Sequence, residues 1–449
     1  MTIKKLSKSL FCVAALVFAT SPLVVFSAED KNKEKKPAPK IEIIVPVTKL
    51  TKSCKPLINK SLKLPKVPIR GLSERSSKRI NRALEKMAEE KYDEALELFL
   101  KLLNSSKDQN VKAITARYIG YLYAQQSKTD GAMKYFSMAL DLGKGYLQHK
   151  DMQDLTQNVA SMLFSADKKK DSLNLLERWL KNSKVNNHNV FLLYSAILED
   201  TGKSRESICP AYWAAKVSPK PNKNAFQLML QGHFNFKDMD GAQALLIQLI
   251  KYFPEDKGNW RNLSSIYMQQ DNTSDALAVM ELFYVQGMME KESDYKQLSA
   301  IFAWSEIPLR TAQILKEGID KKVVEGTEKN WKNVGANFHI AQEINKSVYA
   351  YGKAGEKAKD GENELKQGEL LADDEQFKKA IVKLDVAIKK GVKDEGKVHY
   401  RKGLAYLGLK QYSRAITHLG NATKYKKWRK RSVQWSGYAK TQKKNAAKL

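Results

Sequence analysis

The feature that most constrains the fold is a small residue that recurs about every 35 residues. Ala95 is one example, and it is followed four and seven places later by Phe99 and Leu102. Ten such anchors are separated by gaps of 33 to 40 residues: Ala95, Ala132, Ser172, Ser207, Ala242, Ala276, Ala312, Ser347, Ala380 and Ala415. Two helices of about 13 residues with their turns occupy roughly 34 residues, so the period predicts a helix pair repeated ten times.

The spacing around each anchor predicts how a pair packs. A small residue at the place where two helices cross lets them approach closely. Residues four and seven places further on lie on the same face of the helix and point toward the neighbouring unit. The chain is 43% hydrophobic, enough to fill such a core. We therefore expect an all-α fold, a right-handed superhelical solenoid of about ten helix pairs.

The segments before the anchors match the first helix of a tetratricopeptide (TPR) repeat, W-x2-L-G-x2-Y. Trp260, Leu263, Ser264 and Tyr267 precede Ala276 at the offsets of that pattern. Partial matches precede three other anchors, at Ile119, Gly120 and Tyr123, at Trp331, Val334, Gly335 and Phe338, and at Gly403 and Tyr406. The register of these matches over some 350 residues predicts TPR-like architecture.

The first 28 residues have the pattern of a secretory signal peptide. Lys4, Lys5 and Lys8 precede an almost wholly apolar run from Leu10 to Phe26, and small residues follow at 27–28. A basic start, a short apolar run and a small-residue exit are typical of export, so we expect a cleaved, periplasmic protein. The alternative is an uncleaved anchor in the inner membrane, although the run is short for that role.

The remaining chain divides into three parts. Residues 29–75 are rich in Lys and Pro, and prolines at this density exclude a long helix, so we expect a disordered or extended segment that lies against the first repeats. The repeat array is expected over 76–425. Residues 426–449 are expected to form a basic capping helix and tail, with Trp428, Trp435 and Tyr438 turned inward and the bases outward. A helix that binds a membrane surface or a partner is the alternative.

The charge and the cysteines leave alternatives open. The formal charge is +29, from 78 Lys and Arg against 49 Asp and Glu. Because an exported protein rarely meets nucleic acid, the charge indicates anionic lipid, an acidic protein or simply a solvated surface. Two cysteines follow the signal segment, Cys54 and Cys209. In an oxidising compartment they can form a disulfide or remain two isolated thiols.

No pattern in the sequence indicates catalysis, a cofactor or a metal. None of the six histidines forms H-E-x-x-H or lies at a metal-ligand spacing from a cysteine. Neither G-x-S-x-G nor a phosphate-binding G-x-x-x-x-G-K-[ST] occurs. The S-x-x-K pairs Ser165/Lys168 and Ser293/Lys296 are expected by chance in a chain this rich in Ser and Lys. We therefore expect a protein that is not an enzyme.

The inner groove of the array is the candidate binding surface. Places 2, 5, 9 and 12 of the first helix of each TPR unit line this groove. Counting from the anchors places eleven residues there: Arg117, Tyr121, Phe164, Gln231, Phe234, Arg261, Met268, Trp304, Lys332, His339 and Tyr400. Aromatic, Met and Arg side chains dominate the energetics of protein interfaces. The alternative for each aromatic is ordinary packing between repeats.

A family resemblance narrows the expected role. The residues that carry it are Trp304-Ser-Glu-Ile-Pro308, Ala312 to Gly318, Lys329-Asn-Trp331, Ala341-Gln-Glu343, Ala354, Asp360-Gly361, Gly403 and Trp435-x-x-Tyr438. Over roughly residues 80–440 the chain resembles periplasmic TPR proteins encoded beside the ExbB–ExbD–TonB energy-transducing system. The resemblance implies an accessory role in uptake of iron complexes or similar nutrients, with partners of the TonB or ExbD type. The alternative function is an envelope-assembly or cell-wall factor that recruits enzymes through the same groove.

Overall fold

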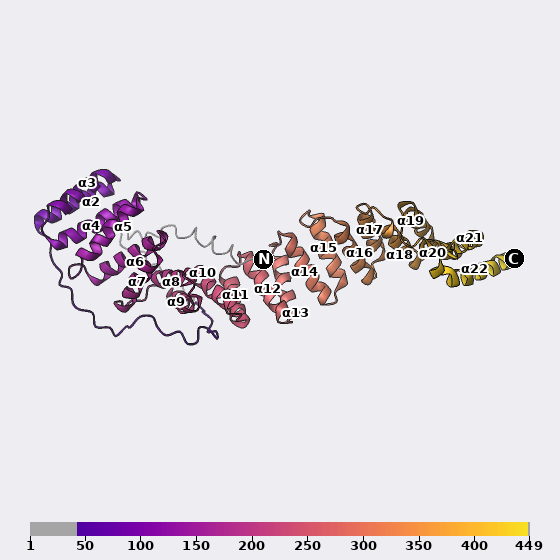
Figure 1. The fold of residues 1–449 in the computed structure, drawn as a ribbon, viewed down its shortest axis with the longest axis horizontal. Helices are drawn as coiled ribbons and strands as arrows, with labels where there is room; N and C mark the ends of the chain where they lie inside the picture. Colours follow the sequence, from indigo (N-terminus) through magenta and orange to yellow (C-terminus); the bar gives the residue numbers. More distant parts are fainter. Residues whose placement is uncertain (1–42, 448–449) are drawn as a thin grey trace, which may run out of the picture. The chain divides into compact units, whose positions relative to one another are not determined.

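The computed structural model describes residues 43–447, and every regular element in that range is an α-helix (Figure 1). The signal-peptide expectation for 1–28 and the linker expectation for 29–40 lie outside the described residues. The helices are α2 (Glu74–Ala88), α3 (Tyr92–Ser105), α4 (Gln109–Gln125), α5 (Thr129–Leu142), α6 (His149–Ser165), α7 (Lys169–Lys181), α8 (His188–Asp200), α9 (Ser204–Val217), α10 (Lys223–Asn235), α11 (Met239–Tyr252), α12 (Lys257–Gln269), α13 (Thr273–Val285), α14 (Glu292–Trp304), α15 (Pro308–Asp320), α16 (Glu328–Ile340), α17 (Ile344–Gly355), α18 (Glu362–Asp373), α19 (Phe377–Lys390), α20 (Glu395–Gly408), α21 (Tyr412–Ala422) and α22 (Lys426–Ala446).

Within this range α2 to α21 form ten consecutive pairs, and α22 follows the last of them. We call the first helix of each pair its A helix and the second its B helix. The chain divides into two compact units, unit 1 up to Pro254 and unit 2 from Glu255, with five pairs in each. In both units each helix packs on the next along the chain. The expected all-α solenoid of helix pairs is confirmed.

The turn from A helix to B helix has the same backbone conformation in all ten pairs. One residue per turn has a left-handed φ, between 53° and 60° at nine positions and 79° at Gly202. The nine others are Glu90, Ser127, Asp167, Lys237, Asp271, Glu306, Gln342, Glu375 and Lys410. A left-handed conformation is unfavourable for a residue with a Cβ atom, so the surrounding pair must hold these turns in place. Since only one of the ten is glycine, the sequence gives little sign of this geometry.

The anchors lie at the helix crossings, as the period predicts. Nine of the ten predicted anchors are the fourth residue of a B helix, and all nine have no exposed surface. Side-chain hydroxyls join the two helices at several crossings. Ser172 donates to the carbonyl of Ala160 at 2.6 Å, and Ser347 donates to that of Gly335 at 2.7 Å. The small side chains thus allow both close approach and a satisfied hydrogen bond inside the core.

The anchor predicted at Ala312 is wrong by one residue. In the other pairs the left-handed turn residue precedes the anchor by five places, and in this pair it is Glu306, which makes Thr311 the anchor. Thr311 is the fourth residue of α15, and its carbonyl accepts a hydrogen bond from Ser299 at 3.0 Å. Leu315, four places after Thr311, is buried as the pattern requires. Threonine and alanine are both small, so the spacing of small residues does not distinguish these two neighbours.

Residues 43–73 form no helix and lie along unit 1; we call this segment the strap. In Figure 1 it is the indigo chain that returns beside unit 1 to reach α2. Its backbone carbonyls at Pro65 and Arg70 bond to His149 at 2.7 Å and to Asn110 at 3.3 Å. The guanidinium of Arg70 also lies 4.5 Å from the ring centre of Tyr146. The strap therefore lies against repeats, and α2 follows it at Glu74, two residues before the predicted start of the array.

The first half of the strap is fastened more firmly. Cys54 and Cys209 form a disulfide, with their Cα atoms 5.2 Å apart, that ties the strap to α9. Thr51 is 2% exposed, and the hydroxyl of Thr48 lies 3.2 Å from Nε2 of the fully buried His233. The backbone N–H of Ile44 donates to the hydroxyl of Tyr252 at 2.8 Å. The strap thus contacts α10 and α11 near its start and α4 near its end, and runs against the direction of the repeats.

Candidate functional site

In unit 2 the A helices α12, α14 and α16 each have one stripe of exposed or partly exposed side chains, which we call the A-helix face. On α14 the stripe has the spacing expected for groove residues when the groove places are counted back from the anchor Thr311. Its members on the three helices are Arg261, Asn262, Ser265, Met268 and Gln269, then Ser293, Lys296, Ala300, Ala303 and Trp304, and finally Lys329, Lys332, Asn333, Ala336, His339 and Ile340. Three successive repeats therefore contribute to one face.

The chemistry of this face changes along the helices. Small side chains occupy its middle, at Ser265, Ala300 and Ala336. Toward the end of the helices two large apolar side chains are exposed, Trp304 at 71% and Ile340 at 67%. A large exposed apolar side chain on a rigid helix next to small neighbours is typical of a contact surface, because it offers area without a competing internal partner.

Lysines lie nearer the start of the same helices. Lys296 pairs with Glu292 at 2.6 Å, and its side chain is 49% exposed. Lys332 lies 3.5 Å from Glu328, and its side chain is 50% exposed. Exposed pairs of this kind on one helix contribute little to stability. Both ammonium groups can therefore exchange these carboxylates for those of a ligand at small cost.

Arg261 has a different role, because it joins two repeats. Its Nε and Nη2 atoms donate to the two carboxylate oxygens of Asp294, at 2.6 Å and 3.0 Å. Asp294 is fully buried and also accepts the backbone N–H groups of Glu290 and Lys291. Burial alone would raise the pKa of Asp294, but the hydrogen bonds from Arg261 and the two N–H groups hold it below the usual value. Arg261 is thus already engaged, and it is a structural residue of the predicted patch.

The predicted groove residues of unit 1 are less accessible. Arg117 bonds to Asp151 across neighbouring repeats at 2.6 Å, as Arg261 does to Asp294 in unit 2. Gln231 donates to Glu199 at 3.0 Å. Three aromatic side chains are half-buried, Tyr121, Phe164 and Phe234. Tyr121 contacts Phe136 edge-on at 5.0 Å, so the packing alternative holds for it.

Some of the remaining predicted residues of unit 2 are accessible, and one packs against a neighbouring helix. Met268 is half-buried and His339 is exposed, both near the end of their A helices. Tyr400 stacks on Trp428 of α22 with ring centres 5.0 Å apart, so it packs against the cap and belongs to no open groove. The structure thus brings Met268, Trp304, Lys332 and His339 onto the A-helix face, with Arg261 at its edge.

Sequence reasoning missed Ile340 and Lys296. Counting from Ala312 places Asp294 and Ile301 on the groove side of α14, but both are buried, at 0% and 2% exposed. The signal that identifies the correct register is Pro308. Proline is favoured at the first turn of a helix, and the anchors elsewhere are the fourth residue of the B helix. Counting Pro308 as the first residue, the fourth is Thr311. From this anchor Ala303 takes place 12 of the groove, and Trp304 follows it at place 13, as Ile340 does on α16.

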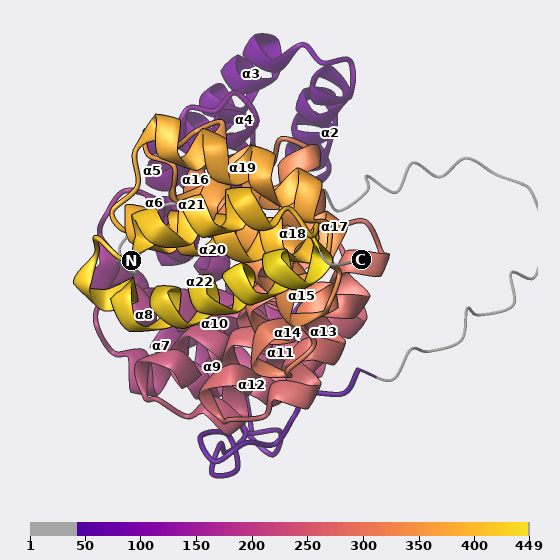
Figure 2. The same cartoon turned by 90° about the vertical axis from the view of Figure 1, so that its right-hand side faces the viewer.

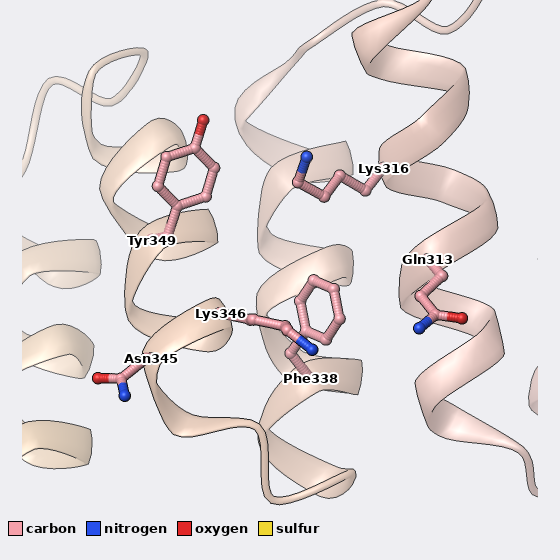
Figure 3. Close-up of a pocket in the computed structure, with 6 residues that line it drawn as sticks. All are labelled: Gln313, Lys316, Phe338, Asn345, Lys346 and Tyr349. Carbon is pink, nitrogen blue, oxygen red and sulfur yellow. The ribbon is translucent and has the colours of Figure 1, made fainter.

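A hollow lies between the B helices α15 and α17 of unit 2 (Figure 3). It has a volume of about 430 Å³ and is lined by Gln313, Lys316, Phe338, Asn345, Lys346 and Tyr349. Its two lysines pair with acids of their own segments, Lys316 with Asp320 at 2.6 Å and Lys346 with Glu343 at 3.0 Å. The hollow offers two aromatic surfaces but little unpaired charge, so the A-helix face is the stronger candidate.

The last repeat contains two histidines in contact. Nδ1 of His399 lies 3.3 Å from Nδ1 of His418, and the ring of Tyr406 stacks on His418. Burial, with the nearby charges of Lys402 and His399, lowers the pKa of His418 to about 4. Burial also lowers the pKa of His399. Both rings are therefore neutral at pH 7.

We expect this pair to make unit 2 less stable in mild acid. Below pH 6.5 the unfolded chain takes up a proton on His418 that the folded chain refuses until about pH 4, so stability falls between these values. From pH 7 to pH 5 the loss from His418 is about 2 kcal/mol. Urea unfolding of the parent and of His418→Gln at both pH values measures it. An equal loss in parent and variant would contradict the assignment.

Among residues 43–447 no three His, Cys, Asp or Glu side chains cluster in a way that would hold a metal ion. Over the same residues no helix has the length and apolar character needed to cross a membrane.

Comparisons with known proteins return TPR structures at low identity. No protein-family model and no curated protein sequence matches the chain. A tetratricopeptide repeat protein from Parabacteroides merdae is 9% identical with a TM-score of 0.35, covering 55% of this chain and 93% of that one. YrrB, a TPR protein with an unusual peptide-binding site, is 15% identical with a TM-score of 0.34, covering 41% and 89%. The APC/C hetero-tetramer Cut9–Hcn1 matches at 13% identity and a TM-score of 0.25, covering 80% and 83%.

These likenesses are too distant to carry any assignment. The architecture is evident from the molecule's own repeats, from the buried anchors and from the ten left-handed turns. By that geometry the chain is a solenoid of TPR-like helix pairs.

Proposed function

We propose that the protein is a scaffold that binds a segment of another protein on the A-helix face of unit 2 and has no catalytic site of its own. The observation that carries the proposal is the exposure of Trp304 and Ile340, at 71% and 67%, at the ends of successive A helices. Interfaces concentrate their binding energy in a few large side chains of this kind.

The chemistry of the face favours an extended segment with acidic and apolar residues. The small side chains at Ser265, Ala300 and Ala336 leave room for a backbone to pass across the helices. On one side of this strip, Lys296 and Lys332 can pair with carboxylates of the bound segment. On the other side, Trp304 and Ile340 can contact its apolar side chains.

We also propose that the protein works in the periplasm. The signal-peptide pattern of residues 1–28 supports export, and the Cys54–Cys209 disulfide fits an oxidising compartment. N-terminal sequencing of the protein recovered from cell fractions tests this. A mature chain that begins at Ala28 or Glu29 is expected, and a cytosolic chain that begins at Met1 or Thr2 would contradict it.

For the partner we propose components of the TonB or ExbD type, on the resemblance of the C-terminal half to the TPR proteins encoded beside that system. An envelope-assembly or cell-wall factor is the second candidate, since the same face would serve it. Contact of the basic surface with an anionic membrane is a further part of the proposal. Cross-linking in cells followed by identification of the captured protein distinguishes the two kinds of partner.

We expect Trp304→Ala to lose binding while the fold is retained. Truncating an interface tryptophan costs about 2–4 kcal/mol of binding energy, or roughly 30- to 1,000-fold in affinity. Because Trp304 is largely exposed, its loss should change the free energy of unfolding by less than about 1 kcal/mol. Pull-down of the partner and a thermal melt measure the two effects.

The matched control is Val285→Ala. Val285 is 78% exposed but lies at the end of the B helix α13, away from the proposed face. It should leave both binding and stability unchanged. Equal binding by the Trp304 variant and the parent would refute the proposed face, as would a large drop in melting temperature of that variant.

A further inference from the structure

The terminal helix α22 differs from the cap that the sequence predicts. Only Trp428 is turned inward: it is 7% exposed, stacks on Tyr400, and donates from Nε1 to Asp394 at 2.8 Å. Trp435 and Tyr438 are 41% and 51% exposed, and their rings contact edge to face at 5.6 Å. Figure 2 shows α22, in yellow, lying in front of α20 and α21. The expectation that all three aromatics point inward is therefore wrong for two of them.

The charged side chains of α22 are also all of one sign. Its 21 residues include eight Lys and Arg and no Asp or Glu. Lys427 pairs with Asp394 at 3.1 Å, and in the part of the chain that the structure describes it is the only base of α22 in an ion pair. Like charges three and four residues apart repel along a helix, so this surplus weakens the helix unless something outside the unit neutralises it.

We infer that α22 binds the surface of an anionic membrane, with Trp435 and Tyr438 at the level of the lipid headgroups and the bases nearest to them around the helix, led by Arg431, on lipid phosphates. Aromatic side chains with a polar edge favour this interface, and each nearby base adds attraction to an anionic leaflet. The inference gives a location to the proposed membrane contact and is independent of the A-helix face.

The distribution of the bases favours lipid over other occupants. The eight bases stand at both ends of the helix, at 426–431 and 440–444, with the exposed aromatics between them. A membrane presents phosphates across such a length, whereas a single acidic side-chain cluster would match one end. Two copies of α22 face to face would oppose their positive charges, which disfavours self-association through this helix.

The test is co-sedimentation of the full chain with vesicles of phosphatidylcholine, with and without phosphatidylglycerol. The parent is expected to sediment with the anionic vesicles and to remain in solution with the neutral ones. Binding should fall about tenfold or more at high salt, because the attraction is screened. Lys430→Glu combined with Arg431→Glu, and Trp435→Ser combined with Tyr438→Ser, should each weaken sedimentation at least about tenfold.

The matched control reverses two exposed lysines elsewhere, Lys378→Glu with Lys379→Glu on α19, for the same change in net charge. It should sediment like the parent. All variants keep the same N-terminal segment, so that segment cannot cause a difference in sedimentation between them. Such a difference therefore reports on α22. Failure of the parent to sediment, sedimentation with neutral vesicles alone, or equal loss in the α19 control would each overturn the inference. If the α22 variants still bind the protein partner, their loss of membrane binding is distinguished from a loss of partner binding at the A-helix face.

Discussion

Removal of the Cys54–Cys209 disulfide is expected to cost unit 1 about 3–5 kcal/mol of unfolding free energy. The two cysteines are 155 residues apart in sequence, and closing so long a loop removes much of the freedom of the unfolded chain. The double variant Cys54→Ser, Cys209→Ser should therefore unfold at a lower urea concentration than the parent. Without urea it should keep its helical circular dichroism signal, because the strap contributes no helix.

Reduction provides the control for this prediction. Dithiothreitol should destabilise the parent by a similar amount and leave the double variant unchanged, since any effect through other groups would appear in both. A parent whose unfolding is insensitive to reduction, while non-reducing electrophoresis shows the bond present, would contradict the expected contribution of the disulfide.

The second large effect is expected at Asp294. Asp294→Ala leaves the N–H groups of Glu290 and Lys291 without their acceptor at a buried site, and leaves Arg261 only the more distant carboxylate of Glu290, at 3.5 Å. Breaking a buried charge pair from one side costs about 3–5 kcal/mol, because the other charge remains desolvated. Urea unfolding of unit 2 measures this loss.

Glu292→Ala is the matched control, in the same helical turn. Glu292 pairs with Lys296 at the surface, and its removal should cost less than about 1 kcal/mol. A similar small cost for both variants would mean that solvent reaches Arg261 freely and that the joint between the two repeats contributes little.

The period of the small residues is sufficient to predict the fold, because only a small side chain fits where two helices cross. Ala95 and Ser172, for example, are fully buried at their crossings. The same reasoning failed where two small residues are adjacent. At 311–312 either can occupy the crossing, and only the turn at Glu306 identifies Thr311.

The candidate site was less predictable, because helical spacing gives direction but not partners. Arg117 and Arg261 do lie at the expected places, yet each is bonded to an acid of the next repeat that the spacing does not reveal. Trp304 and Ile340 are exposed, and helical spacing within one repeat does not show whether a neighbouring repeat covers a side chain. The strap could be expected to be extended, but its route to Cys209 depends on contacts with several helices.

The most direct test of the central claim is site-specific photo-crosslinking to the partner. A photoreactive amino acid replaces Trp304 or Ile340 on the A-helix face, and Val285 or Val382 on the B helices, all four side chains being more than half exposed. The account predicts a covalent adduct with one protein partner from positions 304 and 340 and none from 285 and 382. Adducts from the B-helix positions alone, or equal adducts from all four, would contradict it.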